Sequence, residues 1–325
     1  MRPALVAAAL ALVVAAPVRL AAQPVTPAAD RAALDPSAFR VYTGDGRPAT
    51  FEAVVSAMGG ADAVFLGEQH DDATAHALER AFLEAAHGRY GATRPIVLGL
   101  EMIERDAQHV LDEYRFGYVR ERDFLAASRP WGNYASDYRP LVEFSRERGL
   151  DIAATNVPGR YANLVARGGV EALDRLPLSA HAFLPASPPA PPSAALAARF
   201  REAMSGMEIA HGGASASPHA PNPHGASPHG AAAMPTVDGL LAAQNLRDAA
   251  MAEAVSRHLE RQPGALVVHV NGAFHSEGGL GIPEHLVRYR PGTRTLVVTM
   301  RRTGSLGAAP EASPGDDFVI LTGSP

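Results

Sequence analysis

The stretch "AVFLGEQHDD" (residues 63–72) contains a short apolar run that ends abruptly in ionisable residues. Gly67 closes the run, and one imidazole and three carboxylates follow within residues 68–72. A continuous apolar run of this length, bounded by glycine, predicts a buried β-strand over residues 63–67. A buried strand that ends in charge predicts that its carboxyl end opens onto a site rather than onto core.

A second stretch, "LVVHVNGAFHSEGG" (residues 266–279), repeats this arrangement. Its apolar run ends at Asn271 and Gly272, and His275 follows. Both stretches therefore contain Gly-x-x-His directly after a predicted strand. One copy of so short a motif arises often by chance, but two copies in the same position are informative. Glycine there lets the backbone turn sharply or approach a ligand closely.

Further apolar runs of strand length alternate with helical patterns along the chain. The predicted strands cover residues 39–42, 63–67, 95–101, 151–158, 265–271, 295–300 and 317–322. The predicted helices cover residues 50–58, 73–91, 102–130, 137–149, 160–185, 193–208 and 237–261. Because the strands are continuously apolar, both faces of their sheet must be covered, which favours parallel strands. We predict an α/β fold: a mainly parallel sheet flanked by helices, with a smaller inserted helical subdomain.

The N-terminal residues have the pattern of a secretory signal. Arg2 precedes an apolar segment, Ala4–Ala16, that is too short to span a bilayer comfortably, and small residues follow at Ala21 and Ala22. An uncleaved membrane anchor is the alternative. We predict a signal peptide (1–22), a disordered lead-in (23–38), an α/β domain (39–158 and 263–325), and a helical subdomain (159–262) that contains a disordered His-rich loop (211–235).

Composition excludes several classes of function. The 325 residues contain no cysteine, which rules out disulfides, thiolate metal sites, a cysteine nucleophile and lipoprotein acylation. They contain no lysine either, which rules out Schiff-base chemistry. The net charge is −5 without long blocks of like charge, so no nucleic-acid partner is expected. With the signal segment, this predicts a periplasmic or secreted protein that is not a lipoprotein.

The predicted strands end in groups that could form one site. In open α/β sheets, ligands bind outside the carboxyl ends of the strands. Imidazoles and carboxylates can ligate a divalent ion or transfer protons, although helix capping or ordinary buried hydrogen bonds would also explain them. The candidate catalytic and metal-ligating residues are Glu68, His70, Glu101 and His275, with Asn156 and Asn271 at the same predicted edge.

Two further segments could face this edge. Gln244, Asp248 and Met251 share one stripe of the predicted helix 237–261, which would face either the site or solvent. The segment "RPWGNYASDYRP" (129–140) contains Trp131, Tyr134 and Tyr138, which would either cover a flat apolar ligand or pack between subdomains.

Other polar residues are expected to be ordinary. Gln108 and His109 are interpreted as solvated helix surface, and His76, His87, His181, His258 and His285 are given no role. The histidines of the Pro- and Gly-rich tract would hold a transition metal only loosely and are more simply explained as incidental; they are His211, His219, His224 and His229.

Five ordered motifs carry a family resemblance. "FLGEQHDD", "VLGLEM", "WGNYASDYRPLVEFSRERGLDIAATNVPG", "AQNLRDAAMA" and "VVHVNGAFHSEGGLGIP" together resemble the ChaN family of haem-binding uptake proteins, over residues 40–300. That family is grouped with Tiki/TraB-type and erythromycin-esterase-like proteins. The resemblance implies a parallel sheet with a smaller helical domain, and an exported, iron-regulated protein. The absence of cysteine departs from the lipoprotein members, and the His-rich tract is not typical of the family.

The resemblance also implies ligands and partners. It implies haem as cofactor, held in at least one relative between two subunits by tyrosine, so Tyr134, Tyr138 and Tyr161 become candidate ligands. It leaves open a homodimer and contact with membrane-associated uptake machinery. Tiki relatives are metal-dependent proteases, and their motif positions correspond here to Glu68, His70, Glu101 and His275.

Two functions follow as hypotheses. The first is an exported haem-binding protein of an iron or haem uptake pathway. The alternative is a metal-dependent hydrolase, in which a divalent ion lowers the pKa of water and Glu68 or Glu101 acts as base. A pure interaction module would leave the strand-end residues unexplained. Whether the chain is an enzyme stays open at this point.

Overall fold

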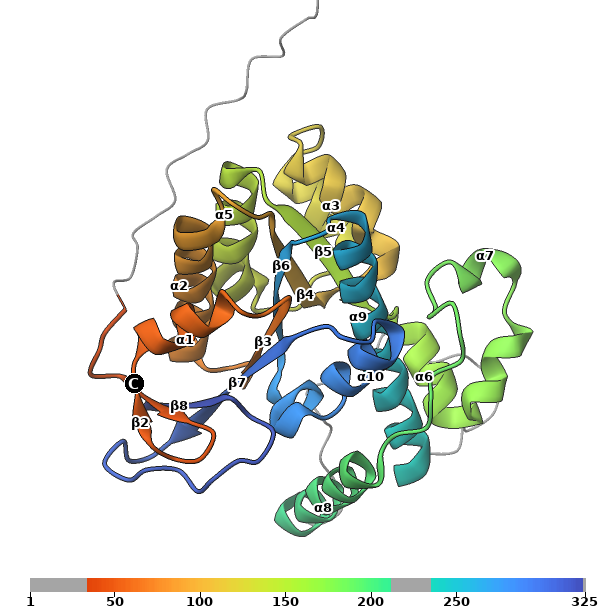
Figure 1. Cartoon of the computed structure of the whole chain (residues 1–325). Coiled ribbons are helices and arrows are strands. Elements are labelled where there is room, and N and C mark those ends of the chain that lie inside the picture. The colour runs from red at the N-terminus through yellow and green to blue at the C-terminus, as the bar shows by residue number, and fades with distance from the viewer. Residues whose placement is uncertain (1–33, 212–234, 324–325) are drawn as a thin grey trace, which may run out of the picture.

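The computed structural model describes residues 34–211 and 235–323, which form one eight-stranded sheet with helices on both faces (Figure 1). The strands are β1 (Phe39–Thr43), β2 (Pro48–Ala49), β3 (Ala63–Glu68), β4 (Ile96–Glu104), β5 (Asp151–Asn156), β6 (Leu266–Gly272), β7 (Thr295–Thr303) and β8 (Phe318–Gly323). The predicted signal segment, residues 23–33 of the predicted lead-in and residues 212–234 of the His-rich tract lie outside the described residues.

Helices fill most of the connections between the strands. The α-helices are α1 (Phe51–Met58), α2 (Ala73–Tyr90), α3 (Gln108–Arg115), α4 (Glu121–Ser128), α5 (Arg139–Arg148), α6 (Gly159–Gly168), α7 (Leu178–His181), α8 (Ala194–His211), α9 (Val237–Arg261) and α10 (Ile282–Tyr289). Short 3-10 or π turns are η1 (Arg105–Ala107), η2 (Tyr134–Tyr138), η3 (Val170–Arg175), η4 (Ala273–His275) and η5 (Glu277–Gly279). Among the helices of the described ranges, none is both long and apolar enough to cross a membrane.

The sheet is mainly parallel, as the sequence predicts. Its strand order is β2-β1-β8-β7-β3-β6-β4-β5, and every pairing from β8 to β5 is parallel. Only β1 runs antiparallel, against β2 on one side and β8 on the other. Because β3 lies between β7 and β6, Gly67 pairs with Asn271 on one side and Thr299 on the other. The two Gly-x-x-His segments therefore leave adjacent strands at the same edge.

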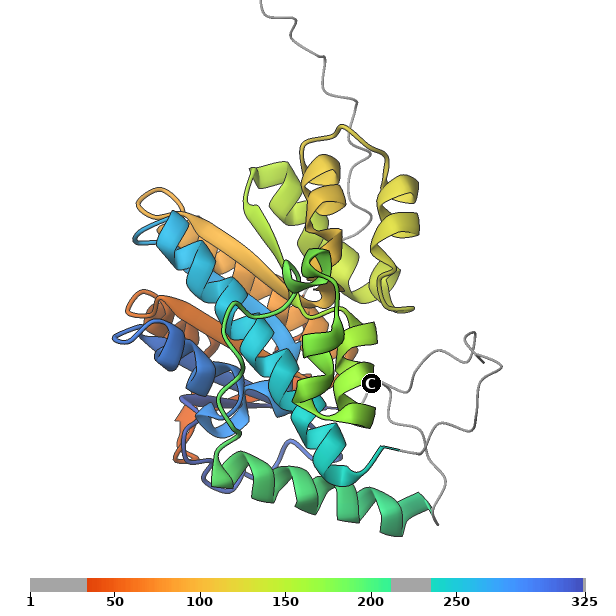
Figure 2. The same cartoon turned by 90° about the vertical axis from the view of Figure 1, so that its right-hand side faces the viewer.

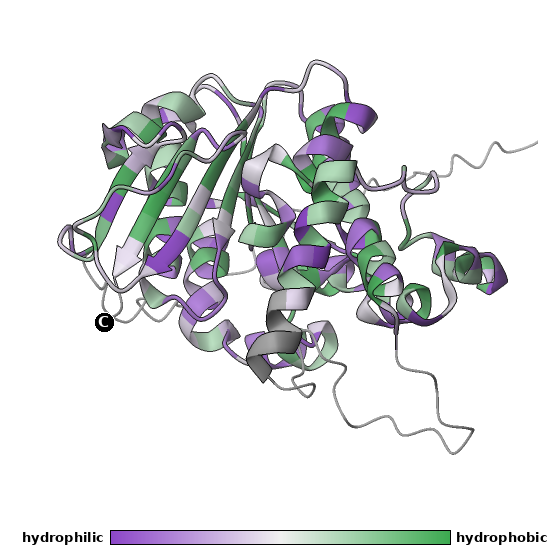
Figure 3. Cartoon of the chain, turned by 90° about the horizontal axis from the view of Figure 1, so that it is seen from below, coloured by the Kyte–Doolittle hydropathy of each residue, from purple (hydrophilic) through white to green (hydrophobic). Residues whose placement is uncertain are grey.

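Both faces of the sheet are buried, which explains the continuously apolar strands. In β3, Val64 and Leu66 belong to the larger core, shared with α1, α2 and α5, whereas Phe65 packs with α9 and α10 on the opposite face. Figures 1 and 2 show α2 and α5 on one side of the sheet and α9 and α10 on the other. Figure 3 shows the strands largely in the green of hydrophobic residues.

Helix α9 links the sheet to the predicted helical insertion. Its C-terminal half packs on the sheet through Met251, Val255 and Leu259. Its N-terminal half packs against α6 through Leu246 and Ala250 in a separate apolar cluster. Figure 2 shows α8 lying across the N-terminal end of α9. The same helix thus anchors the insertion and crosses the sheet near the ends of the strands.

Strand β4 is longer than its apolar run. It continues to Glu104, where the sequence predicts helix from residue 102. The register against β5 shifts between two pairs, Leu100 with Ala154 and Glu104 with Asn156, so β4 carries extra residues there. A bulge of this kind re-aims side chains at a strand end. Glu101 therefore lies inside the strand, at the irregular stretch, rather than at its end.

The chain before β1 is ordered over its last residues. Residues 36–38 form a turn and bend, and the Gly323 N–H of β8 donates to the Ala38 carbonyl at 2.8 Å. These residues form the end of the segment predicted as a disordered lead-in.

Candidate functional site

The first Gly-x-x-His segment places its histidine against a buried carboxylate. Glu68 is the last residue of β3, and its Oε1 lies 2.9 Å from His70 Nδ1. The same oxygen accepts a hydrogen bond of 2.7 Å from the Tyr138 hydroxyl, which reaches in from η2. The Trp131 ring lies edge-on to the His70 ring, with centroids 4.7 Å apart. His70 is thus oriented by a carboxylate and flanked by the aromatic segment.

The second segment holds its histidine between two carboxylates. His275, at the end of η4, places Nε2 3.1 Å from Glu101 Oε1 and Nδ1 2.5 Å from Asp248 Oδ1. The Gln244 side-chain amide lies 2.9 Å from the same Nδ1. Glu101 comes from β4, whereas Asp248 and Gln244 come from one stripe of α9. Two separate elements, β4 and α9, therefore clamp one imidazole.

Electrostatics bias both histidines toward the protonated form. Burial disfavours a charged imidazole at His275, but Glu101 and Asp248 outweigh it and raise its pKa to about 10. Burial opposes protonation of His70 as well, yet the carboxylates of Glu68 and Glu101 raise its pKa. The site therefore combines proton-bearing imidazoles with carboxylates in a region of low dielectric.

The two segments meet at Gly272. Its N–H donates to Glu101 Oε2 at 2.7 Å. A Cβ added there would lie 2.7 Å from His70 Cε1 and 3.6 Å from Glu101 Oε2, so only glycine leaves room for the His70 ring. Glu68, His70, Glu101 and His275 are therefore brought together, as predicted from their places at the strand ends.

The expectation that this edge opens to solvent is wrong for most of the cluster. Glu68, Glu101 and His275 are 2%, 1% and 3% exposed, whereas 23% of the His70 side chain is exposed. The reason lies in two covering elements, since α9 supplies groups over Glu101 and His275, and η2 supplies Tyr138 over Glu68. Within this cluster, His70 is the member that faces solvent.

A third group lies behind His70 and was not predicted. His76 Nδ1 in α2 lies 3.0 Å from Glu68 Oε2 and 3.1 Å from Glu79 Oε2. Burial and the nearby Glu68 raise the pKa of Glu79 to about 8. Burial opposes protonation of His76, but Glu79 and Glu68 raise its pKa to about 10. The ligand-capable atoms of all three residues lie within 4.8 Å of one another.

His76 was expected to be ordinary because it lies outside the apolar stripe that the helical pattern indicates. Ala75, Leu78 and Phe82 form that stripe and are fully buried. His76 and Glu79 are spaced i, i+3 beside it, which puts both on the buried side of α2. Two ionisable residues bordering a buried stripe are the signal that could have identified them.

The three candidate tyrosines are all buried. Tyr138 donates to Glu68, and burial raises the pKa of both the Tyr134 and Tyr138 phenols. Tyr161, on α6, accepts a hydrogen bond from Arg160 and lies in the apolar cluster of the helical insertion. The structure brings Tyr138 to the central cluster, and none of the contacts described for Tyr161 joins it there.

The remaining predicted residues divide between the site and its support. Asn271 donates to Ser276 Oγ at 2.9 Å, and its Oδ1 lies 3.0 Å from His269 Nδ1, so it braces the turn after β6. Asn156 accepts from Arg247 at 3.4 Å beside the cluster. Met251 packs against the sheet in the apolar core, away from the charged groups.

Gln108 is not the solvated surface residue that was expected. Its Nε2 donates to the Ile152 carbonyl at 2.9 Å, and its Oε1 accepts from Ala154 N–H at 2.7 Å. It therefore satisfies backbone groups of the edge strand β5. His109 beside it is exposed, as expected.

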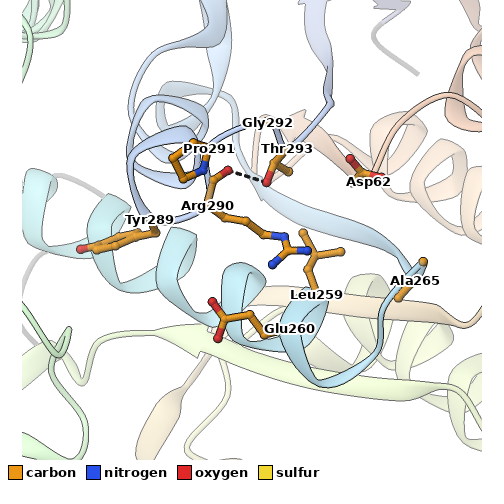
Figure 4. Close-up of a pocket in the computed structure, with 10 residues that line it drawn as sticks. Asp62, Leu259, Glu260, Ala265, Tyr289, Arg290, Pro291, Gly292 and Thr293 are labelled. Atoms are coloured by element: carbon orange, nitrogen blue, oxygen red, sulfur yellow. Dashed lines mark hydrogen bonds between the residues drawn. The ribbon is translucent and has the colours of Figure 1, made fainter.

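A separate hollow lies at the opposite edge of the sheet (Figure 4). Its volume is about 430 Å³, and it opens where β3 and β6 begin and where α10 leads into β7. Asp62, Glu260, Tyr289 and Arg290 are among its lining residues. None of the predicted site residues lines it.

Comparison with known proteins agrees with this architecture. The family model described as "Haem-binding uptake, Tiki superfamily, ChaN" matches residues 54–286. The solved structure of cofacial heme binding to ChaN of Campylobacter jejuni has a TM-score of 0.59 at 16% identity, covering 88% of this chain and 98% of that chain. A mutant of the erythromycin esterase EreC in its open conformation has a TM-score of 0.45 at 13% identity, covering 87% and 82%.

None of the curated proteins matches this chain. At 16% identity the Campylobacter jejuni structure shows the fold alone, whereas the family model spans well over half of the 325 residues and includes both Gly-x-x-His segments. This chain therefore belongs to the ChaN family of haem-binding uptake proteins in the Tiki superfamily.

Proposed function

We propose that this protein binds haem, as an exported component of a haem or iron uptake pathway. The observation that carries the proposal is His70, an imidazole held by Glu68, flanked by Trp131 and partly exposed at the edge where both motifs meet. Family membership supports the ligand class, since the family model describes haem-binding uptake proteins. The fold neighbour from Campylobacter jejuni is a structure of cofacial heme binding.

The residues at this edge fit haem. An imidazole is a common axial ligand of haem iron, and the Trp131 ring offers flat apolar area beside it. The tyrosines fit less well, because Tyr134, Tyr138 and Tyr161 are buried and Tyr138 already donates to Glu68. When bound, haem supplies an iron centre that accepts such a ligand. We therefore assign the iron-facing role to His70 rather than to a tyrosine.

A hemin titration tests this assignment. Adding hemin to the purified wild-type protein is expected to shift the Soret band, and His70→Ala is expected to abolish the shift. His109→Ala is the matched control, because His109 is an exposed histidine on α3. Loss of the shift in Tyr161→Phe but not in His70→Ala would overturn the assignment. No shift in the wild type would overturn haem binding itself.

Export and assembly belong to the same proposal. We infer that residues 1–22 direct secretion to the periplasm or beyond, and mass spectrometry of the mature N-terminus tests this. A homodimer is the proposed haem-bound assembly, and membrane-associated uptake machinery is the proposed recipient. Light scattering of the protein with and without hemin is expected to show a doubling of mass on binding.

A metal-dependent hydrolase is the second candidate, favoured by the clamped His275. Two imidazoles and two carboxylates, from Glu68, His70, Glu101 and His275, form a donor set that suits a divalent transition ion. Such an ion would lower the pKa of water, while Asp248 fixes the orientation of His275. Chelator-sensitive hydrolysis of peptide or ester substrates, lost in Glu101→Gln and kept in Glu143→Gln, would establish this activity. Absence of hydrolysis with Zn²⁺, Mn²⁺ or Co²⁺ would count against it.

A further inference from the structure

Glu68, His76 and Glu79 form a compact buried group behind His70. Their side chains are at most 5% exposed, and their ligand-capable atoms lie within 4.8 Å of one another. We propose that these three residues bind a divalent first-row transition ion, such as Zn²⁺ or Mn²⁺, at a site distinct from the contact at His70. One His nitrogen and two carboxylates are a common protein donor set for such ions.

The surroundings of His76 favour a metal-binding tautomer. Its Nε2 faces two acceptors, the His70 carbonyl at 3.3 Å and Asp137 Oδ2 at 3.4 Å. In the neutral ring, a hydrogen on Nε2 satisfies these acceptors, and an ion at Nδ1 would replace the proton that otherwise lies between the imidazole and the carboxylates. Metal-ligating histidines commonly donate their other N–H to a carboxylate or a backbone carbonyl in this way. Asn133 steadies the arrangement, because its side-chain amide donates to both the His70 carbonyl and Asp137.

The carboxylates hold more acceptor capacity than the protein satisfies. Within the described part of the chain, Glu79 Oε1 is buried without a hydrogen-bond partner, and Glu68 Oε2 shares the single His76 Nδ1 with Glu79 Oε2. Nδ1 of His76 carries at most one hydrogen, yet carboxylate oxygens of both glutamates lie within 3.1 Å of it. Buried carboxylate oxygens without donors are costly, so a cation or a proton must offset them.

The distances are compatible with shared coordination. Ligand atoms bonded to one ion at about 2.0–2.1 Å lie about 2.8–3.4 Å apart in tetrahedral or octahedral geometry. Nδ1 lies 3.0 Å from Glu68 Oε2 and 3.1 Å from Glu79 Oε2. Because the other oxygen of Glu68 contacts His70 and Tyr138, an ion here would also fix the carboxylate that orients His70.

Metal stoichiometry separates this site from the proposed haem contact. The purified full-length protein is stripped with a chelator, exposed to ZnCl₂ or MnCl₂, dialysed and analysed by inductively coupled plasma mass spectrometry. The wild type is expected to retain one equivalent, lost in His76→Ala and in the near-isosteric Glu79→Gln. Glu143→Gln, a buried glutamate in α5, is the matched control, and it is expected to retain the ion. The histidines of the 211–235 tract are common to all variants and do not affect the difference.

Further variants decide between sites. His70→Ala and His275→Ala are expected to retain the ion while His70→Ala loses the hemin shift, so failure of either proposal is visible without the other. Asp137→Ala, which removes an acceptor from Nε2, is expected to weaken retention about ten-fold. Retention by Glu79→Gln equal to that of the wild type would overturn the proposal and favour a shared proton. Loss in His275→Ala, with the fold intact by circular dichroism, would place the ion in the other cluster and overturn it equally.

Discussion

The two Gly-x-x-His segments begin alike and end in different environments. Each follows a parallel strand at the same sheet edge, and β3 and β6 pair in register up to Glu68 and Gly272. His70 contacts one carboxylate through Nδ1 and keeps part of its ring in solvent, whereas His275 is enclosed between two carboxylates. The same four-residue pattern therefore yields an accessible imidazole and a buried one.

The difference comes from the elements that pack over each turn. A helix lies over the second segment, where α9 contributes Asp248 and Gln244 to His275. The first segment is covered by a π turn and by the Trp131 ring, which leave part of the His70 side chain exposed. We therefore propose different tasks for the two histidines: contact with a ligand for His70, and electrostatic organisation of the site for His275.

The largest expected effect is on stability, from His275→Ala. Removing the imidazole leaves Glu101 and Asp248 buried without their cationic partner, and breaking such a pair costs about 3–5 kcal/mol. Urea unfolding followed by circular dichroism measures the loss. His285→Ala is the control, because His285 is also buried but its Nε2 contacts only the neutral Asn245. Equal losses in the two variants would show that the carboxylate clamp contributes nothing beyond packing.

The next prediction concerns pH and a third histidine, His269, in the same strand as Gly272. Burial lowers the pKa of His269 to about 4, below the ordinary 6.5, so the folded state holds it neutral. The stability that depends on a neutral His269 is fully present above pH 6.5 and is lost as the pH falls toward 4. The difference between these two pKa values corresponds to about 3 kcal/mol of unfolding free energy. Asn271 Oδ1 and Thr155 Oγ1 lie 3.0 and 2.9 Å from its nitrogens.

Unfolding free energies of the wild type and His269→Asn between pH 7 and pH 4 test this. The variant starts less stable, and its stability is expected to fall less steeply with acid than that of the wild type. His109→Asn, at an exposed position, is expected to keep the wild-type slope. Parallel slopes for the wild type and His269→Asn would contradict a neutral, buried His269.

Substituting the motif glycines sharpens the contrast between the segments. In Gly272→Ala the new methyl group would lie 2.7 Å from His70 Cε1 and must displace that ring. We expect a loss of about 1–3 kcal/mol from overpacking, together with loss of the hemin Soret shift. In Gly67→Ala the methyl group meets Ala273 Cα and Ser276 Oγ, each at 3.0 Å, and none of its three nearest atoms belongs to His70. That variant is expected to be destabilised yet to keep the hemin shift; loss of the shift in both would remove the argument from His70.

The fold could be predicted because it depends on local patterns. Continuously apolar runs such as residues 63–67 and 265–271 identify strands buried on both faces, and their alternation with helices identifies a parallel sheet. Glycine after each run marks the turn that carries a histidine to the edge. The irregular stretch of β4 could not be predicted, because it depends on the register with β5 rather than on the composition of residues 102–104.

The site was predictable at its strand ends and less so elsewhere. The apolar runs identify Glu68, Glu101 and His275 as residues at or near strand ends. The i, i+4 spacing places Gln244 and Asp248 on one stripe of a helix. Burial of the cluster was not predictable, since it depends on where α9 and η2 pack in three dimensions. His76 and Glu79 were not predicted because their partner, Glu68, lies on the preceding strand. The loop between β3 and α2 brings the three residues together, and its conformation is not evident from the sequence.

The smallest expected effect completes the comparison. His70→Ala removes an imidazole that is partly exposed, while Glu68 keeps its hydrogen bond from Tyr138 and its contact with His76. Because Glu68 keeps these two partners, the loss of stability is expected to be about 1 kcal/mol, the net value of the one hydrogen bond that is removed. Urea unfolding of His70→Ala beside His275→Ala measures the difference. A loss as large as that of His275→Ala would mean that both imidazoles hold the fold together, and the loss of hemin binding in His70→Ala could then no longer be read as loss of a ligand.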